Sequence, residues 1–202
     1  MSDMDWKRVT AHEPTTAVEG DRKAAVLVPV IIRPDGEYLL FTKRADHLGE
    51  HPGQMSFPGG GYEPEDEDLA VTAKREAFEE VGLDPDAAEI VGQLDDIPTV
   101  SNYLVRPFVA KVPDQEYTPD EREVAEIAIL PLSGLTDLEN YESERRDHPY
   151  YGDIRIHYFR VNGYTVWGAT GRMLVQFLEL ATDWRMPSEP DRIVDPDAEY
   201  PV

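Results

Sequence analysis

The side chains of this sequence that could do chemistry gather between positions 75 and 80. Glu76, Glu79 and Glu80 follow Arg75 in one short segment. At about 100° per residue, a helix here would carry the three glutamates within an arc of about 100°. Carboxylate oxygens on one face are the ligands that hard divalent cations such as Mg²⁺ prefer. A solvated acidic face is the alternative, because 41 of the 202 residues are acidic.

A helix must position these glutamates, and the sequence predicts one over Pro64–Val81. Proline suits the first turn of a helix, and Gly82 suits its end. Like charges four residues apart, near a helix C-terminus, destabilise the helix, so a positive partner should compensate them. The opposite face is expected to be apolar and buried, and it contains Ala70, Val71, Ala77, Phe78 and Val81.

The glutamates also belong to a longer spaced pattern. It reads Gly61-x5-Glu67-x7-Arg75-Glu76-Ala77-x-Glu79-Glu80-x-Gly82-Leu83. This pattern resembles the Nudix box, with every fixed position filled; Ala77 stands where a bulkier aliphatic residue is common. The resemblance implies a Nudix hydrolase, in which water attacks phosphorus in a nucleoside diphosphate linked to another moiety, with the help of Mg²⁺ or Mn²⁺.

The same resemblance implies roles for the box residues. The metal shell would comprise Glu76, Glu79, Glu80 and the Gly61 carbonyl, and the catalytic set would comprise the three glutamates with Arg75. Glu76 could instead orient or deprotonate the attacking water. Arg75 and Glu67 are expected to form a charge pair that locks the loop onto the helix, and Gly82 is expected to be structural.

A further acidic ligand or base often comes from a later loop in this family. The sequence does not choose among four eligible residues, which are Glu116, Asp120, Glu121 and Glu123.

Upstream of the box lies a cluster that suits an anionic ligand. Its side chains are basic or hydrogen-bonding, and the glycines that follow allow the backbone to approach a phosphate closely. The predicted substrate-binding residues are Thr42, Lys43, Arg44, His51, Gly59 and Gly60. For Lys43 and Arg44 the alternative is simple neutralisation of neighbouring acids on a strand end.

This upstream region is similar to the signature of the coenzyme A pyrophosphatase branch of the Nudix family. The similar stretches are Leu39–Ala45, His51–Gly60, Arg106–Val109 and Tyr164–Thr170. Two departures concern substrate recognition, since Phe41 intervenes before Thr42 and Gly49 stands where the branch usually has Arg.

The similarity implies cleavage of CoA or a CoA derivative to adenosine 3',5'-bisphosphate and 4'-phosphopantetheine or its acyl form. The alternatives are a Nudix hydrolase of another nucleoside diphosphate derivative, such as ADP-ribose, and a non-catalytic Nudix-fold binding module. For Trp167 and Tyr164, core packing is favoured over stacking on an adenine.

Alternation of apolar residues and turn signals predict the elements around this site. A helix is expected over Thr170–Asp183, and a hairpin at Pro34–Gly36. The resulting fold is an α/β sandwich of Nudix type, with helices on both faces of a mixed β-sheet. Its domain spans 23–186, between an N-terminal extension (1–22) and a C-terminal tail (187–202), both expected at the surface or partly disordered. The expected strands are Ala24–Arg33, Tyr38–Thr42, Ile90–Leu94, Arg106–Val112, Glu126–Leu130, Ile154–Val161 and Tyr164–Trp167.

Composition excludes several classes of protein. A net charge of −22 disfavours nucleic acid as a partner, and the absence of cysteine excludes disulfides and thiolate chemistry. The longest apolar run, Ala24–Ile32, is too short for a membrane helix, and the first twenty residues contain no secretory signal. We therefore expect a cytoplasmic enzyme with a small-molecule substrate. The sequence leaves the oligomeric state open, a homodimer included.

The charge also suggests adaptation to concentrated salt. With 41 acidic and 19 basic side chains, the surface repels itself most strongly at low ionic strength. We expect the melting temperature to rise along a salt series. Maximal stability in dilute buffer would contradict this hypothesis.

Overall fold

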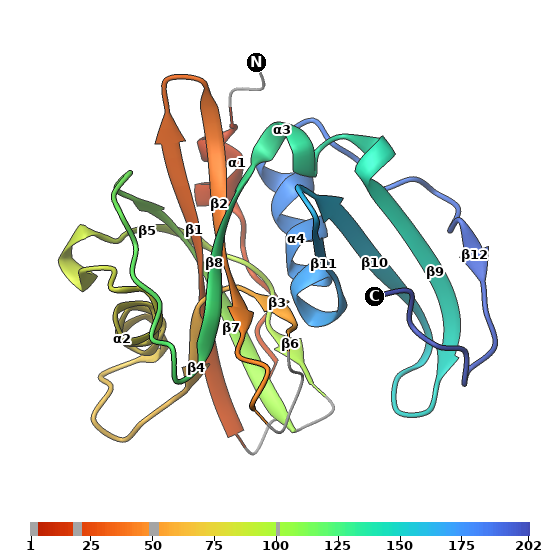
Figure 1. Ribbon diagram of the computed structural model, residues 1–202, viewed down its shortest axis with the longest axis horizontal. Helices are drawn as coiled ribbons and strands as arrows, with labels where there is room; N and C mark the ends of the chain where they lie inside the picture. Colours follow the sequence, from red (N-terminus) through yellow and green to blue (C-terminus); the bar gives the residue numbers. More distant parts are fainter. Residues whose placement is uncertain (1–3, 18–21, 49–52, 100–101) are drawn as a thin grey trace.

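The computed structural model describes residues 4–17, 22–48, 53–99 and 102–202. Within them the chain forms two β-sheets with helices packed on both faces of the larger one (Figure 1). The strands of the larger sheet are β1 (Arg22–Arg33), β2 (Gly36–Arg44), β3 (Met55–Ser56), β4 (Gly59–Gly61), β5 (Glu89–Gln93), β6 (Ile97–Pro98), β7 (Tyr103–Val112) and β8 (Val124–Pro131).

The larger sheet is mixed, as predicted. Its main order is β3-β2-β1-β7-β5, and β4, β6 and β8 pair with β1, β7 and β2. The central strands β1 and β7 run parallel, whereas β1 and β2 form an antiparallel hairpin that pairs Arg33 with Gly36. β1 is buried along most of its length because it carries apolar side chains for both faces of the sheet.

Helix α2 (Leu69–Val81) covers one face of this sheet and carries the box. Ala73, Ala77 and Val81 are fully buried against β1 and β7. The expected start at Pro64 is wrong, because the Asp68 carboxylate caps the helix by accepting hydrogen bonds from the N–H groups of residues 70 and 71. The expected burial of Val71 and Phe78 is also wrong, since they are 39% and 55% exposed.

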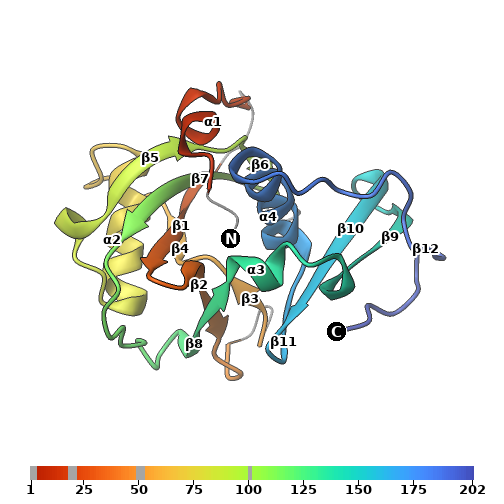
Figure 2. The same cartoon turned by 90° about the horizontal axis from the view of Figure 1, so that it is seen from above.

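The opposite face is covered by α1 (Trp6–Ala11), α4 (Gly168–Ala181) and the short α3 (Leu132–Leu135). Figures 1 and 2 both place α4 between the two sheets. Its residues Met173, Leu174, Phe177 and Leu178 join the larger of two apolar cores. The helical spacing therefore predicted α4 correctly, with both ends displaced by two residues from Thr170–Asp183.

The smaller sheet has the order β11-β10-β9-β12. Only β10 (Gly152–Val161) and β11 (Tyr164–Val166) were expected from the sequence. β9 (Tyr141–His148) escapes prediction because five of its eight residues are charged, namely Glu142, Glu144, Arg145, Arg146 and Asp147. The remaining elements are β12 (Arg192–Ile193) and two single 3₁₀ turns at Pro85–Ala87 and Leu138–Asn140.

Both ends of the chain contribute ordered elements. Helix α1 packs against β5 and α4, and β12 runs parallel to β9. Arg155 on β10 donates to the carbonyl oxygens of Pro187 and Glu189 at 2.7 Å. The division into 1–22, 23–186 and 187–202 is a proposal, in which the described parts of both flanking segments pack on the central domain. Among the described residues, no helix combines the length and the hydropathy that a membrane crossing requires.

A buried histidine on strand β10 of the smaller sheet makes stability sensitive to acid. His157 is 7% exposed, and its Nδ1 hydrogen-bonds the Tyr141 hydroxyl at 2.8 Å. Burial, helped by the charges of Arg155 and Arg172, lowers the pKa of His157 from 6.5 to about 4. Between pH 6.5 and pH 4 the histidine is therefore protonated in the unfolded chain but neutral in the folded protein. The free energy of unfolding falls as the pH drops through this range.

We expect His157 to account for a loss of about 2 kcal/mol of unfolding free energy between pH 8 and pH 5. The replacement His157→Gln should lower stability at pH 8 but flatten this part of the pH profile. Urea unfolding at both pH values measures the two slopes. Parallel profiles for the two proteins would contradict the assignment.

Candidate active site

The buried member of the glutamate triplet is Glu80. It is 9% exposed, and its Oε2 accepts a hydrogen bond from the Gly59 N–H at 3.1 Å. Burial raises its pKa to about 8; the Gly59 N–H and the charge of Arg44 oppose this shift, whereas Glu76 and Glu123 add to it. Arg44 on β2 therefore lies near Glu80, as expected for a cation beside the box.

Glu76 lies against the glycine strand β4. A Cβ atom added to Gly60 would approach the Glu76 carboxylate to 2.5 Å, so this position accepts only glycine while Glu76 keeps its place. Burial raises the pKa of Glu76, and the neighbouring Arg75 opposes the shift. Glu79 is more exposed, and Arg75 Nη1 donates to its Oε2 at 3.4 Å.

Arg75 fastens the box loop to α2, but through a different partner from the one expected. Its Nε and Nη2 donate to the two carboxylate oxygens of Asp66 at 2.9 and 3.0 Å, and Nη2 also reaches the Gly61 carbonyl oxygen at 3.0 Å. The expected pair with Glu67 is wrong. Asp66 points inward because its Oδ2 also accepts hydrogen bonds from the Glu63 N–H and the Thr72 hydroxyl, whereas Glu67 is exposed.

This pairing predicts opposite outcomes for two adjacent acids. The Arg75 guanidinium holds the pKa of Asp66 well below its usual range, so the charged pair stabilises the fold at neutral pH. Asp66→Asn should lower the unfolding free energy by about 2 kcal/mol. Glu67→Gln should change it by less than about 0.5 kcal/mol. Chemical denaturation of both variants is the measurement, and equal effects would refute the assignment.

The later acidic segment is tied to the end of α2. The Thr118 and Asp120 N–H groups donate to the carbonyl oxygens of Val81 and Glu80 at 3.2 and 2.9 Å. These bonds satisfy carbonyl groups that the helix end leaves unpaired. Gly82, with a φ of 72°, ends the helix there, and its N–H donates to Phe78 O.

Among the four eligible acids of this region, Glu123 is the one whose charge acts on both Glu76 and Glu80 and raises their pKa values. The Asp120 carboxylate instead accepts several hydrogen bonds from the Arg122 guanidinium. Glu116, Glu121 and Glu123 are all exposed. Because its charge acts on both glutamates, Glu123 is the further acid that we propose below.

The donor chemistry of this cluster fits a hard divalent cation. Burial and mutual repulsion raise the pKa values of Glu76 and Glu80, and a bound cation would offset both effects. As placed, the described His, Asp and Glu side chains form no group of three that could hold an ion. Arg75 stands between Glu76 and Glu79 and also holds the Gly61 carbonyl, so binding an ion through Glu79 or Gly61 requires these contacts to rearrange.

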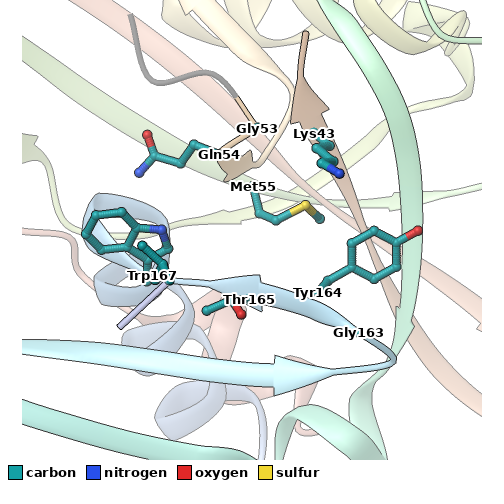
Figure 3. A pocket seen from close by; sticks show the side chains of 9 residues that line it. Lys43, Gly53, Gln54, Met55, Gly163, Tyr164, Thr165 and Trp167 are labelled. Carbon is teal, nitrogen blue, oxygen red and sulfur yellow. The ribbon is translucent and has the colours of Figure 1, made fainter. Parts of the chain in front are cut away.

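A cavity of about 380 Å³ lies between the two sheets (Figure 3). Residues of β2 and β3 line one side of it, and residues around β11 line the other. The lining residues are Lys43, Gly53, Gln54, Met55, Gly163, Tyr164, Thr165, Trp167 and Val202.

The predicted substrate-binding residues divide between the cavity and the glutamates. Lys43 lines the cavity, whereas the charge of Arg44 acts on Glu80; consecutive side chains of β2 point to opposite faces of the sheet. Thr42 is 2% exposed, and its hydroxyl contacts the Ser56 carbonyl and hydroxyl oxygens, so it joins β2 to β3 and does not line the cavity. His51 lies outside the described residues.

Two aromatic residues combine the expected core packing with a place at the cavity, since Tyr164 packs against the larger apolar core. Tyr164 and Trp167 are half-buried and line the cavity. The Tyr164 hydroxyl donates to Glu126, and the Trp167 ring stacks on Tyr158 with centroids 6.0 Å apart. Gln54 and Met55 also face the cavity, although only their place in the glycine-rich stretch hinted at such a role.

Comparison with known proteins shows the family of this chain. The family model described as the NUDIX domain matches residues 21–151. The uncharacterized Nudix hydrolase NudL of Enterobacter sp. (strain 638) is 40% identical over 157 residues, which cover 76% of this chain and 79% of that protein. The protein of the same name from Yersinia enterocolitica is 35% identical over 170 residues, covering 80% and 83%.

A solved structure supports the fold. The MutT/nudix family protein from Enterococcus faecalis superposes with a TM-score of 0.51 at 13% identity, covering 83% of this chain and 62% of that one. The box spacing, the helix that presents its glutamates and the matched domain lead to one conclusion. The chain belongs to the Nudix family, and it is a hydrolase.

Proposed function

We propose that this hydrolase cleaves the diphosphate of CoA or a CoA derivative to adenosine 3',5'-bisphosphate and 4'-phosphopantetheine or its acyl form. The observation that carries the proposal is the lining of the cavity. Lys43, Gly53, Gln54 and Met55 come from the two stretches that resemble the CoA branch, and they form one side of it. A volume of about 380 Å³ is within the range of small-molecule sites.

In this proposal the substrate lies with its diphosphate near β4 and one end in the cavity. Lys43 and Arg44 attract the anionic groups, and the backbone at Gly59 and Gly60 allows close approach. Glu76 or Glu123 orients the attacking water and accepts its proton. Arg75 holds the loop and the helix together through Asp66.

We propose that Glu76, Glu79, Glu80 and Glu123 hold Mg²⁺ or Mn²⁺, apart from whichever of Glu76 and Glu123 acts as the base. A bound cation supplies charge stabilisation for the diphosphate and lowers the pKa of coordinated water. Such compensation suits a chain with a net charge of −22, because the bare protein would repel an anionic substrate. We also propose that the enzyme works in the cytoplasm on small molecules.

Product analysis with CoA and ADP-ribose side by side tests the substrate. In the presence of Mg²⁺ or Mn²⁺ we expect a higher kcat/KM for CoA, with adenosine 3',5'-bisphosphate as a product. An equal or reversed preference would refute the CoA assignment and favour another nucleoside diphosphate derivative. Absence of turnover on both compounds, with binding retained, would indicate a binding module.

A further inference from the structure

The segment 198–202 is fastened to the smaller sheet by two arginines. Arg146 Nη1 donates to the Ala198 carbonyl oxygen at 2.8 Å, and Arg160 Nη2 donates to the Pro201 carbonyl oxygen at 2.8 Å. The guanidinium carbon of Arg146 also lies 4.1 Å from the centre of the Tyr200 ring. Hydrogen bonds and a cation–π contact therefore hold this segment at several points.

The anchor of this segment is an ion pair that is almost completely buried. Arg146 and Glu144 are 2% and 1% exposed, and Arg146 Nε donates to Glu144 Oε1 at 3.0 Å. The Tyr158 hydroxyl donates to the same oxygen at 2.9 Å. Burying two charges is costly and adds little stability relative to apolar packing, so fixed geometry is a better explanation for such a pair.

This anchored segment reaches the cavity. The Tyr200 ring lies 5.0 Å from the Trp167 ring between centroids, and Trp167 and Val202 both line the cavity. A continuous series of contacts thus connects Glu144 and Arg146 through Tyr200 to the cavity wall. Figure 3 shows Trp167 on the β11 side and Lys43 and Gln54 on the β2–β3 side.

We propose that residues 198–202 form a specificity wall of the substrate site, in which Arg146 and Tyr200 are positioning residues for Trp167 and Val202. The inference rests on the proposed function in one respect, namely that part of the substrate enters this cavity. The two side chains that this wall presents to the cavity, Trp167 and Val202, are aromatic and apolar, and the Lys43 ammonium and the Gln54 amide line the other side. It therefore selects a substrate moiety that has an apolar face and a polar or anionic edge.

Tyr200→Ala tests the wall because it removes the ring that contacts Arg146 and Trp167. Tyr200→Phe is the conservative variant, because it keeps this ring and removes only the hydroxyl. We expect Tyr200→Ala to change the ratio of kcat/KM between CoA and ADP-ribose by about tenfold, mainly through KM, and Tyr200→Phe to restore it. Dissociation constants of both compounds, measured by calorimetry, should show the same change without turnover.

Arg146→Met should change the ratio in the same direction, and Arg145→Met is its matched control. Arg145 is the neighbouring residue of β9, is exposed, and its side chain pairs with Asp153. If Arg146→Met does not fold, the Tyr200 variants still decide the question.

The outcomes separate this inference from the proposed function. A wild-type preference for ADP-ribose over CoA would refute the proposed substrate. The change in the kcat/KM ratio between wild type and Tyr200→Ala would still test whether the wall affects specificity. A Tyr200→Ala variant that leaves the ratio unchanged in both kcat/KM and dissociation constants, or a Tyr200→Phe variant that fails to restore it, would overturn the inference.

Discussion

Replacing Glu80 by Gln should reduce kcat about a thousandfold while leaving the fold intact. The amide has the same shape and can still accept the Gly59 N–H, but it removes one buried negative charge from the cluster proposed to hold the cation. Steady-state kinetics with Mg²⁺ measures this loss. Full activity of the variant would exclude Glu80 from the site.

The same variant makes a second prediction in metal-free protein. Because the folded-state pKa of Glu80 is raised from 4.5 to about 8, the folded protein holds a proton that the unfolded chain releases between these values. Stability contributed by this group therefore falls as the pH rises through that window. Glu80→Gln should be more stable than wild type at pH 8 and lose the stabilisation that Mg²⁺ gives wild type.

Glu123 and Glu121 provide a matched comparison for the cluster. Glu123→Gln should lower kcat by about a hundredfold if this residue supplies a ligand or the base. Glu121→Gln removes an acid from the same segment and should leave kcat unchanged. Equal activity of both variants would return the choice of the further acid to Glu116 or Asp120.

Alanine substitutions at three consecutive glycines should have three different effects. At Gly59 an added Cβ would lie 2.4 Å from the Ala25 carbonyl oxygen, and neither backbone can move away within the β1–β4 pairing. Gly59→Ala should therefore lose more than about 3 kcal/mol of stability, a large part of what an ordinary domain possesses.

At Gly60 the added Cβ would meet only the end of the Glu76 side chain, at 2.5 Å. This side chain can turn away, so Gly60→Ala should fold with little loss of stability and lose most of its activity. At Gly61 nothing lies within 4 Å of the added Cβ, and Gly61→Ala should keep its stability. Thermal melting and kinetics of the three variants are the measurements; a stable Gly59→Ala or a fully active Gly60→Ala would contradict the geometry.

The parts of the site that the sequence predicted are those that depend on helical periodicity within one short segment. Glu76, Glu79 and Glu80 share a helix face because helical geometry alone relates residues three and four apart. Gly82 ends that helix because its φ of 72° suits glycine. The main strands of the larger sheet were likewise found from short apolar runs.

The sequence did not predict which of two neighbouring side chains makes a contact, or which way some side chains point. The choice of Asp66 over Glu67 as the partner of Arg75 depends on how the turn before α2 folds, which the Glu63 N–H and the Thr72 hydroxyl determine. Phe78 faces outward although its type suggests burial. Two adjacent acids such as Asp66 and Glu67 can point in opposite directions, one buried and one exposed. The amino-acid types alone do not indicate which of the two points inward.

The sequence by itself therefore determined the family, the helix and the carboxylate face, since these follow from spacing within about twenty residues. Only the tertiary structure placed Asp66 against Arg75, paired Glu144 with Arg146 in a highly charged strand, and joined β2 and β3 to β11 around one cavity. Some of these contacts join segments far apart in the chain. The buried Glu144–Arg146 pair also depends on β10, because the Tyr158 hydroxyl of that strand donates a hydrogen bond to Glu144. Their energies arise on folding, when distant segments meet and water is excluded.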